Sequence, residues 1–201
     1  MTPSITKEVK NIDLVEFLKF NNFNKDICEK FENYYNMLLK WGKKINLFSR
    51  KDTFILARKH FQDSIFLSKL ISKNSSVLDI GSGAGFPAIP LKIVRNDLKI
   101  FLVESKLKKF IFLSNVIRSL NLENMWVINK RVEDILSFDC KFDYITLKAV
   151  RIDFSLILKF LKSDGKIIKY VSQEKDKDMF KFKNPFLRNE VKIVVYRKGG
   201  K

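Results

Sequence analysis

The sequence predicts an α/β fold in which a mostly parallel, doubly wound sheet follows an N-terminal helical extension. From residue 77 onward, apolar strand-like runs alternate with helix-like stretches, the pattern of a parallel sheet covered on both faces. A glycine-rich turn follows the first apolar run, and doubly wound sheets carry such turns at their carboxyl edge. The length of 201 residues is enough for one domain with an extension and a buried core.

We expect residues 1–75 to form the helical extension and residues 76–201 to form the sheet-containing core. Apolar residues recur at helical spacing through much of the extension, and residues 73–76 are a polar loop that marks the expected seam. Three helices are predicted there, at residues 7–20, at residues 24–44 with Asn24 or Asp26 as the N-cap, and at residues 53–72.

In the core, strands and helices are expected to alternate. The predicted strands are residues 77–80, 99–104, 125–129, 142–147, 166–171 and 190–196. The predicted helices lie near residues 86–95, 106–120, 153–162 and 174–182. Asp164 and Gly165 are expected to form a turn before the fifth strand.

The turn after the first strand indicates the kind of ligand. Asp79 precedes Gly81, Gly83 and Gly85, and glycines let the backbone turn sharply and approach a ligand closely. The dinucleotide fingerprint would need glycine where Phe86 stands, and no P-loop Gly-Lys-Ser/Thr ending follows. The spacing therefore favours an adenosine ligand without phosphates, such as S-adenosylmethionine. The alternative is an ordinary glycine-rich loop between a strand and a helix.

Other candidate ligand contacts follow the second and third strands. Glu104 ends the second strand about 20 residues after the glycines, where a ribose-binding acid belongs in a nucleotide-binding sheet. Val132 and Glu133 follow the third strand, at the edge expected to lie over the adenine. For that pair the alternative is a solvated loop with capping acids.

Two further pairs are candidates for the reacting end of the site. Lys148 and Arg151 follow the fourth strand, where a basic side chain can hold a carboxylate or an RNA phosphate. His60 and Asp63 lie three residues apart on one helix face and are candidates to line the cleft. The alternatives are surface charges for the first pair and a structural hydrogen-bonding role for His60.

The composition limits the kinds of partner that are expected. A net charge of +17 suggests a polyanionic partner, although an AT-rich genome would also enrich Lys, Phe, Ile and Asn. Two cysteines and one histidine favour neither a disulfide framework nor a metal site. No apolar run of about 18 residues and no signal-like N-terminus occur, so we expect a cytoplasmic protein with no membrane partner.

Two missing motifs restrict the reaction. The chain has no Asn/Asp-Pro-Pro-Tyr/Phe run, which enzymes that methylate exocyclic amines use, and no Pro-Cys nucleophile for cytosine C5 chemistry. Targets that are already nucleophilic remain. Guanine N7 has a free lone pair and requires no general base, so an enzyme for it mainly positions two groups in line.

The ordered set of motifs resembles the bacterial 16S rRNA guanine-N7 methyltransferase family called RsmG, formerly GidB. Its most specific mark is residues 85–91, Gly-Phe-Pro-Ala-Ile-Pro-Leu. Residues 46–49, 60–64 and 131–133 also match, as does Glu104 with the lysines after it. The resemblance implies a class I (Rossmann-like) methyltransferase fold, S-adenosylmethionine as methyl donor, and 16S rRNA or the assembling small ribosomal subunit as partner. We expect a monomer without a metal.

The resemblance also implies roles for single residues. Gly81 and Phe86 would contact S-adenosylmethionine, Val132 and Glu133 would flank its adenine, and Glu104 would hold the ribose hydroxyls. The family usually has arginine where this chain has Lys148. Lysine keeps the positive charge but lacks the bidentate fork of a guanidinium group. Candidate rRNA phosphate contacts are Lys43, Lys44, Arg50, Lys51, Arg58 and Lys106 to Lys109.

Overall fold

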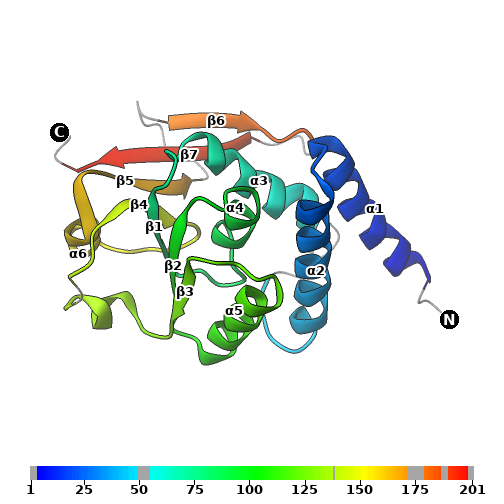
Figure 1. The fold of residues 1–201 in the computed structure, drawn as a ribbon, viewed down its shortest axis with the longest axis horizontal. Helices are drawn as coiled ribbons and strands as arrows, with labels where there is room; N and C mark the ends of the chain where they lie inside the picture. Colours follow the sequence, from blue (N-terminus) through cyan, green and yellow to red (C-terminus); the bar gives the residue numbers. More distant parts are fainter. Residues whose placement is uncertain (1–3, 49–54, 138, 172–178, 187–189, 199–201) are drawn as a thin grey trace.

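The computed structural model describes residues 4–48, 55–137, 139–171, 179–186 and 190–198 (Figure 1). The strands are β1 (Ser76–Ile80), β2 (Lys99–Val103), β3 (Met125–Ile128), β4 (Phe142–Leu147), β5 (Leu161–Val171), β6 (Met179–Lys183) and β7 (Glu190–Arg197). The α-helices are α1 (Ser4–Asn21), α2 (Lys25–Gly42), α3 (Gln62–Phe66), α4 (Ala88–Val94), α5 (Leu107–Ser119) and α6 (Phe154–Ile157). A π-helical turn spans Ala57–Phe61, and 3₁₀ turns span Leu67–Lys69, Val132–Ile135 and Leu158–Phe160.

The strands form one sheet in the order β3-β2-β1-β4-β5-β7-β6. Strands β1 to β5 are parallel, and β7 and β6 complete the sheet in antiparallel pairing. Strand order reverses around β1, because β2 lies on one side of it and β4 on the other. This confirms the predicted mostly parallel, doubly wound sheet, and ligands of such sheets bind where the order reverses.

The two faces of the sheet are covered differently. Successive residues of a strand point to opposite faces, and Val77 of β1 packs in one apolar core while Leu78 packs in the other. Helices α1 to α5 contribute to the core around Val77. The core around Leu78 is closed mainly by the short turn at residues 132–135 and by residues 154–160.

Helix α2 brings the N-terminal extension onto the core. Asn24 is its N-cap, because its side chain accepts a 3.0 Å hydrogen bond from the Ile27 N–H, which resolves the choice between Asn24 and Asp26. Phe31, Tyr34 and Leu38 recur at helical spacing and are fully buried in the core shared with α4 and α5. The division of the chain at residue 75 stays a prediction, and the apolar core crosses it.

Three predicted helices differ from the structure. Residues 179–182 belong to strand β6 rather than to a helix over 174–182, and residues 174–178 lie outside the described part. Phe180 and Phe182 alternate with lysines, and this period of two suits pairing with β7. The predicted helix 153–162 ends at residue 160 because β5 begins at Leu161.

The third is the predicted helix 53–72. Its described part is divided into the π-helical turn, α3 and a 3₁₀ turn. Asp164 and Gly165 lie within β5, where the pairing with β4 shifts register, rather than in a turn before it.

Among the described residues, no helix is both long and apolar enough to cross a bilayer.

A buried carboxylate fixes α1 to the π-helical turn. Asp13 is fully buried and accepts hydrogen bonds from the N–H groups of Ala57 and Arg58, at 2.8 and 3.1 Å. The Arg58 Nε donates a third, at 2.9 Å. Burial raises the pKa of Asp13, and these hydrogen bonds counteract the shift. These hydrogen bonds therefore stabilise the ionised form of Asp13 in the interior.

We predict that Asp13→Ala lowers the free energy of unfolding by about 3 kcal/mol or more, because it leaves the two N–H groups without their acceptor and Arg58 with Glu16 alone. Chemical denaturation at pH 7 measures the change. Asp26→Ala is the matched control, since Asp26 is exposed in the first turn of α2 and pairs with Lys30, and its loss should cost about 1 kcal/mol or less. Equal losses in the two variants would contradict the anchoring role of Asp13.

Candidate active site

The turn after β1 requires glycine for its backbone shape. Gly81, Gly83 and Gly85 have φ values of 71°, 59° and 98°, a region that side chains strongly disfavour. A Cβ on Gly81 would also lie 2.5 Å from the Val150 side chain. A Cβ on Gly83 would meet the Gly81 carbonyl at 3.7 Å and the Lys109 Nζ at 3.9 Å, which are ordinary contacts, so the positive φ rather than a clash requires glycine there.

Glu104 fastens this turn to the end of β2. Its carboxylate accepts one hydrogen bond from the Gly83 N–H and one from the Lys106 N–H, each at 2.8 Å. The Asn129 side chain donates to the Glu104 carbonyl at 2.8 Å. One carboxylate thus joins the turn after β1 to the start of α5.

Asp79 lies beneath the turn. Its Oδ1 accepts a 2.6 Å hydrogen bond from Thr146, which is its register partner on β4. Its Oδ2 is buried and has no hydrogen-bond partner among the described residues. Burial raises the pKa of Asp79 to about 6, although the bond from Thr146 and the charge of Lys148 act in the opposite direction. The site therefore holds a buried acceptor next to the ligand-binding turn.

The first of two hollows lies between the turn and the N-terminal part. It has a volume of about 270 Å³. The His60 ring stacks on Phe86 with ring centroids 4.9 Å apart and an angle of 19° between the planes. Its lining residues are Leu47, Phe48, His60, Gly81, Ser82, Gly83, Ala84, Phe86, Lys109, Lys148 and Ala149.

Lys148 and Lys109 are the two lysines of this first hollow, and Lys148 lies against its aromatic residues. Its ammonium lies 5.6 Å from the centroid of Phe86 and 4.9 Å from that of Tyr170, within the range of cation–π interactions. Burial raises the pKa of Asp63, and the charge of Lys148 lowers it in part. Asp63 also accepts a 2.8 Å hydrogen bond from Asn184. Asp63 thus supports Lys148 electrostatically.

The second hollow also borders Gly81 and has a volume of about 210 Å³. Val132 is almost fully buried at the start of the 3₁₀ turn over residues 132–135. The lining residues are Ile80, Gly81, Val103, Ser105, Lys130, Arg131, Val132 and Glu133. Since Gly81 lines both hollows, a ligand that lies along the turn can enter both.

Most of the predicted site residues are brought together. Gly81, Gly83, Phe86, His60 and Lys148 line the first hollow, and Gly81, Val132 and Glu133 line the second. Asp79, Glu104 and Asp63 support them from beneath or behind.

Two predicted residues lie elsewhere. A Cβ on Gly85 would meet Ile89 at 2.5 Å and the Tyr34 hydroxyl at 2.9 Å, so its space is limited by interior packing. Arg151 is exposed and lines neither hollow. No group of His, Cys, Asp and Glu suited to a metal ion occurs among the described residues.

Sequence reasoning missed several supporting residues. Thr146 could have been found from strand register, because a buried Asp79 needs a donor on a neighbouring strand. The Tyr34 hydroxyl donates to the Ala84 carbonyl at 2.6 Å, and its position in α2 indicated only packing. Tyr170 and Asn184 come from distant parts of the chain, and no local pattern links them to Asp63 and Lys148.

The structure separates the candidate phosphate contacts into residues that are already ion-paired, residues that lie outside the described part, and lysines that remain candidates. Arg58 is bonded to Asp13 and Glu16, each at 2.9 Å, so its charge is already compensated. Arg50 and Lys51 lie outside the described residues. The remaining candidates, Lys43, Lys44 and Lys106 to Lys109, include five lysines near the start of α5 and the end of α2.

Comparisons with known proteins identify the family of this chain. The sequence profile of the GidB family, described as rRNA small subunit methyltransferase G, matches residues 27–199. A ribosomal RNA small subunit methyltransferase G from Geotalea uraniireducens is 42% identical over 69% of this chain and 65% of its own length. Another with that name, from Desulforamulus reducens, is 38% identical over 74% of this chain and 65% of its own. The matched region thus spans slightly less than two thirds of these relatives.

A solved structure supports the fold independently. A putative protein-L-isoaspartate O-methyltransferase from Plasmodium falciparum superposes with a TM-score of 0.50 over 92% of each chain, at 17% identity. At this identity the likeness concerns the fold alone. The family is established by the sequence matches, which extend over most of the chain. This chain belongs to the rRNA small subunit methyltransferase G (GidB) family.

Proposed function

We propose that this protein transfers a methyl group from S-adenosylmethionine to N7 of a guanosine in 16S rRNA, as a monomer in the cytoplasm. The observation that carries the proposal is the glycine turn with two hollows beside it, both of which Gly81 lines. One hollow suits an adenosine, and the other, with Lys148 in its wall, suits the reacting end. Family membership and the net charge of +17 support an RNA substrate.

The residues present fit S-adenosylmethionine. The glycine backbone at Gly81 and Gly83 lets a ligand approach closely, and the buried Oδ2 of Asp79 provides an acceptor beneath it. Val132 and Glu133 would hold the adenine and Glu104 the ribose. The Gly81 and Gly83 backbone and the charge of Lys148 would hold the amino-acid end. When bound, this cofactor supplies a methyl group on a positively charged sulfur.

The chain's own contribution to the reaction is positioning. Guanine N7 carries a free lone pair and loses no proton on methylation, so no general base is needed. Phe86 and the stacked His60 give the first hollow an aromatic wall against which a base can pack. Because a paired and stacked guanosine cannot present N7 in such a hollow, the target must be in a loop or be unstacked.

A methylation assay tests the proposed product. Purified protein with S-adenosylmethionine should form 7-methylguanosine in 16S rRNA or in 30S subunits from cells that lack the gene, as measured by mass spectrometry. Gly81→Ala should lower the rate by about 100-fold or more, because the added Cβ would lie 2.5 Å from Val150 and misplace the cofactor.

Retained thermal stability and 16S rRNA binding by Gly81→Ala would show that the variant is folded. A wild-type protein that forms no 7-methylguanosine in either substrate would contradict the proposed function.

The buried Asp79 makes the stability of the protein depend on pH. Its pKa of about 6 lies above the ordinary value of 3.8, so its ionised form destabilises the folded protein above pH 6, and the penalty disappears as pH falls toward 4. Asp79→Asn should therefore raise the free energy of unfolding at pH 8 by up to about 3 kcal/mol. The gain should vanish near pH 4, and S-adenosylhomocysteine binding should weaken at pH 8.

Asp143→Asn provides a control with the opposite sign. Burial raises the pKa of Asp143, but hydrogen bonds from Ser76 and Lys162 outweigh it, so the pKa is lowered overall. This carboxylate stabilises the protein at pH 8 and loses that effect in acid, so Asp143→Asn should destabilise at pH 8. Urea denaturation across pH 4 to 8 measures both. Destabilisation by Asp79→Asn at pH 8 would contradict the account of Asp79.

A further inference from the structure

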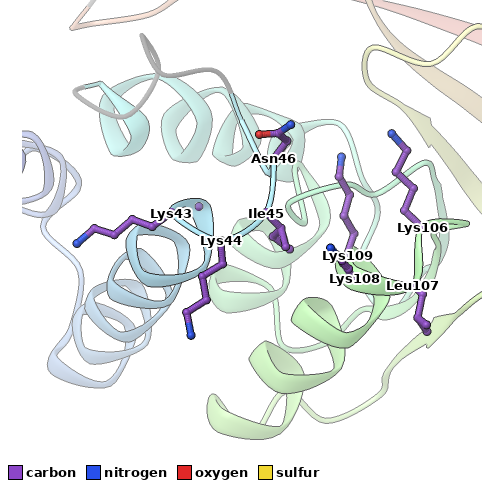
Figure 2. A pocket seen from close by; sticks show the side chains of 9 residues that line it. Lys43, Lys44, Ile45, Asn46, Lys106, Leu107, Lys108 and Lys109 are labelled. Carbon is purple, nitrogen blue, oxygen red and sulfur yellow. The ribbon is translucent and has the colours of Figure 1, made fainter.

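A third hollow carries a concentrated positive charge. It has a volume of about 550 Å³ and lies between the end of α2 and the start of α5 (Figure 2). We call it the lysine groove. It is lined by Gly42, Lys43, Lys44, Ile45, Asn46, Lys106, Leu107, Lys108 and Lys109. Five of these nine residues are lysines and none is acidic.

These lysines are not compensated by carboxylates within the part of the chain that the structure describes. None of the five forms an ion pair there, whereas Arg58 and Arg95 are bonded to aspartates at 2.9 and 2.7 Å. Lys43, Lys44, Lys106 and Lys108 are exposed, and Lys109 is half-buried. Like charges held close together repel one another, so binding an anion in the groove relieves this repulsion and is favourable.

The directions of the side chains indicate the shape of that anion. Lys106 and Lys109 extend in the same direction from the start of α5 (Figure 2). Lys43 and Lys44 extend in other directions from the end of α2. The ammonium groups do not converge on one point, as a single phosphate would require. They instead suit an extended, flexible polyanion, and lysine binds successive phosphates as a mobile point charge.

The lysine groove continues into the candidate active site. Lys109 lines both the groove and the hollow that contains Phe86 and Lys148. Its Nζ lies 3.9 Å from the position that a Cβ on Gly83 would occupy. Lys109 therefore connects the lysines of the groove with the glycine turn.

The geometry points to the lysine groove as the site that binds the sugar–phosphate backbone of a single-stranded RNA segment next to the target guanosine. The inference rests on the proposed function and names the surface that binds its substrate. Because phosphates are common to every sequence, the groove provides affinity and direction, and the hollow at Phe86 selects the base.

The test replaces the four exposed groove lysines, in a variant with Lys43→Gln, Lys44→Gln, Lys106→Gln and Lys108→Gln. Lys109 stays, because it also lines the active-site hollow. The control variant carries Lys73→Gln, Lys99→Gln, Lys181→Gln and Lys183→Gln, which are exposed lysines that do not line the groove. Both variants lose four positive charges, so a general charge effect would be equal in the two.

Filter binding of 16S rRNA is measured for each protein between 0.05 and 0.3 M salt. Each lost contact with a single strand should lower the slope of log affinity against log salt by about 0.7, so the groove variant should lose about 3. Its affinity at 0.1 M salt should fall by about 10-fold or more. The control should stay close to the wild type, and S-adenosylhomocysteine binding should be unchanged in both variants.

Equal slopes and affinities for the two variants would overturn the inference, as would a wild-type protein that does not bind 16S rRNA. The inference fails alone if the wild type forms 7-methylguanosine and the groove variant still binds RNA normally. The proposed function fails alone if the groove lysines determine RNA binding but the wild type forms no 7-methylguanosine.

Discussion

The site depends on one carboxylate that binds two backbone N–H groups. Glu104 accepts from Gly83 and from Lys106, and so fixes the distance between the glycine turn and the start of α5. Both hollows of the candidate active site border this turn, and the lysine groove borders the start of α5. A single side chain thereby positions the glycine turn against the start of α5, where the lysine groove lies.

The N-terminal helices hold the same turn from the opposite side. Tyr34 of α2 donates to the Ala84 carbonyl, and Phe61 packs near Phe86 with ring centroids 6.0 Å apart. His60 reaches the first hollow from the π-helical turn, which Asp13 anchors to α1. The extension is therefore part of the site, because it supplies one wall of the hollow in which the reaction is proposed to occur.

Local pattern predicted the parallel core and the glycine turn well, because buried strands and glycine spacing leave direct traces in the sequence. It failed at β6, where the predicted helix 174–182 overlaps a strand. Pairing with β7 and the stacking of Phe182 on Phe66 stabilise that strand, and neither contact is local in the sequence. It placed His60, Lys148 and Glu104 at the site. It did not find Tyr170 or Asn184, since their contacts with Lys148 and Asp63 join segments far apart in the sequence.

The most direct measurement is a crystal structure of the protein with S-adenosylhomocysteine bound. The account predicts the adenine beside Val132, the ribose at Glu104 and the amino-acid end along Gly81 and Gly83 toward Lys148. A ligand bound elsewhere, or one that leaves the Glu104 carboxylate and the hollow at Val132 untouched, would contradict the assignment of the glycine turn as the cofactor site.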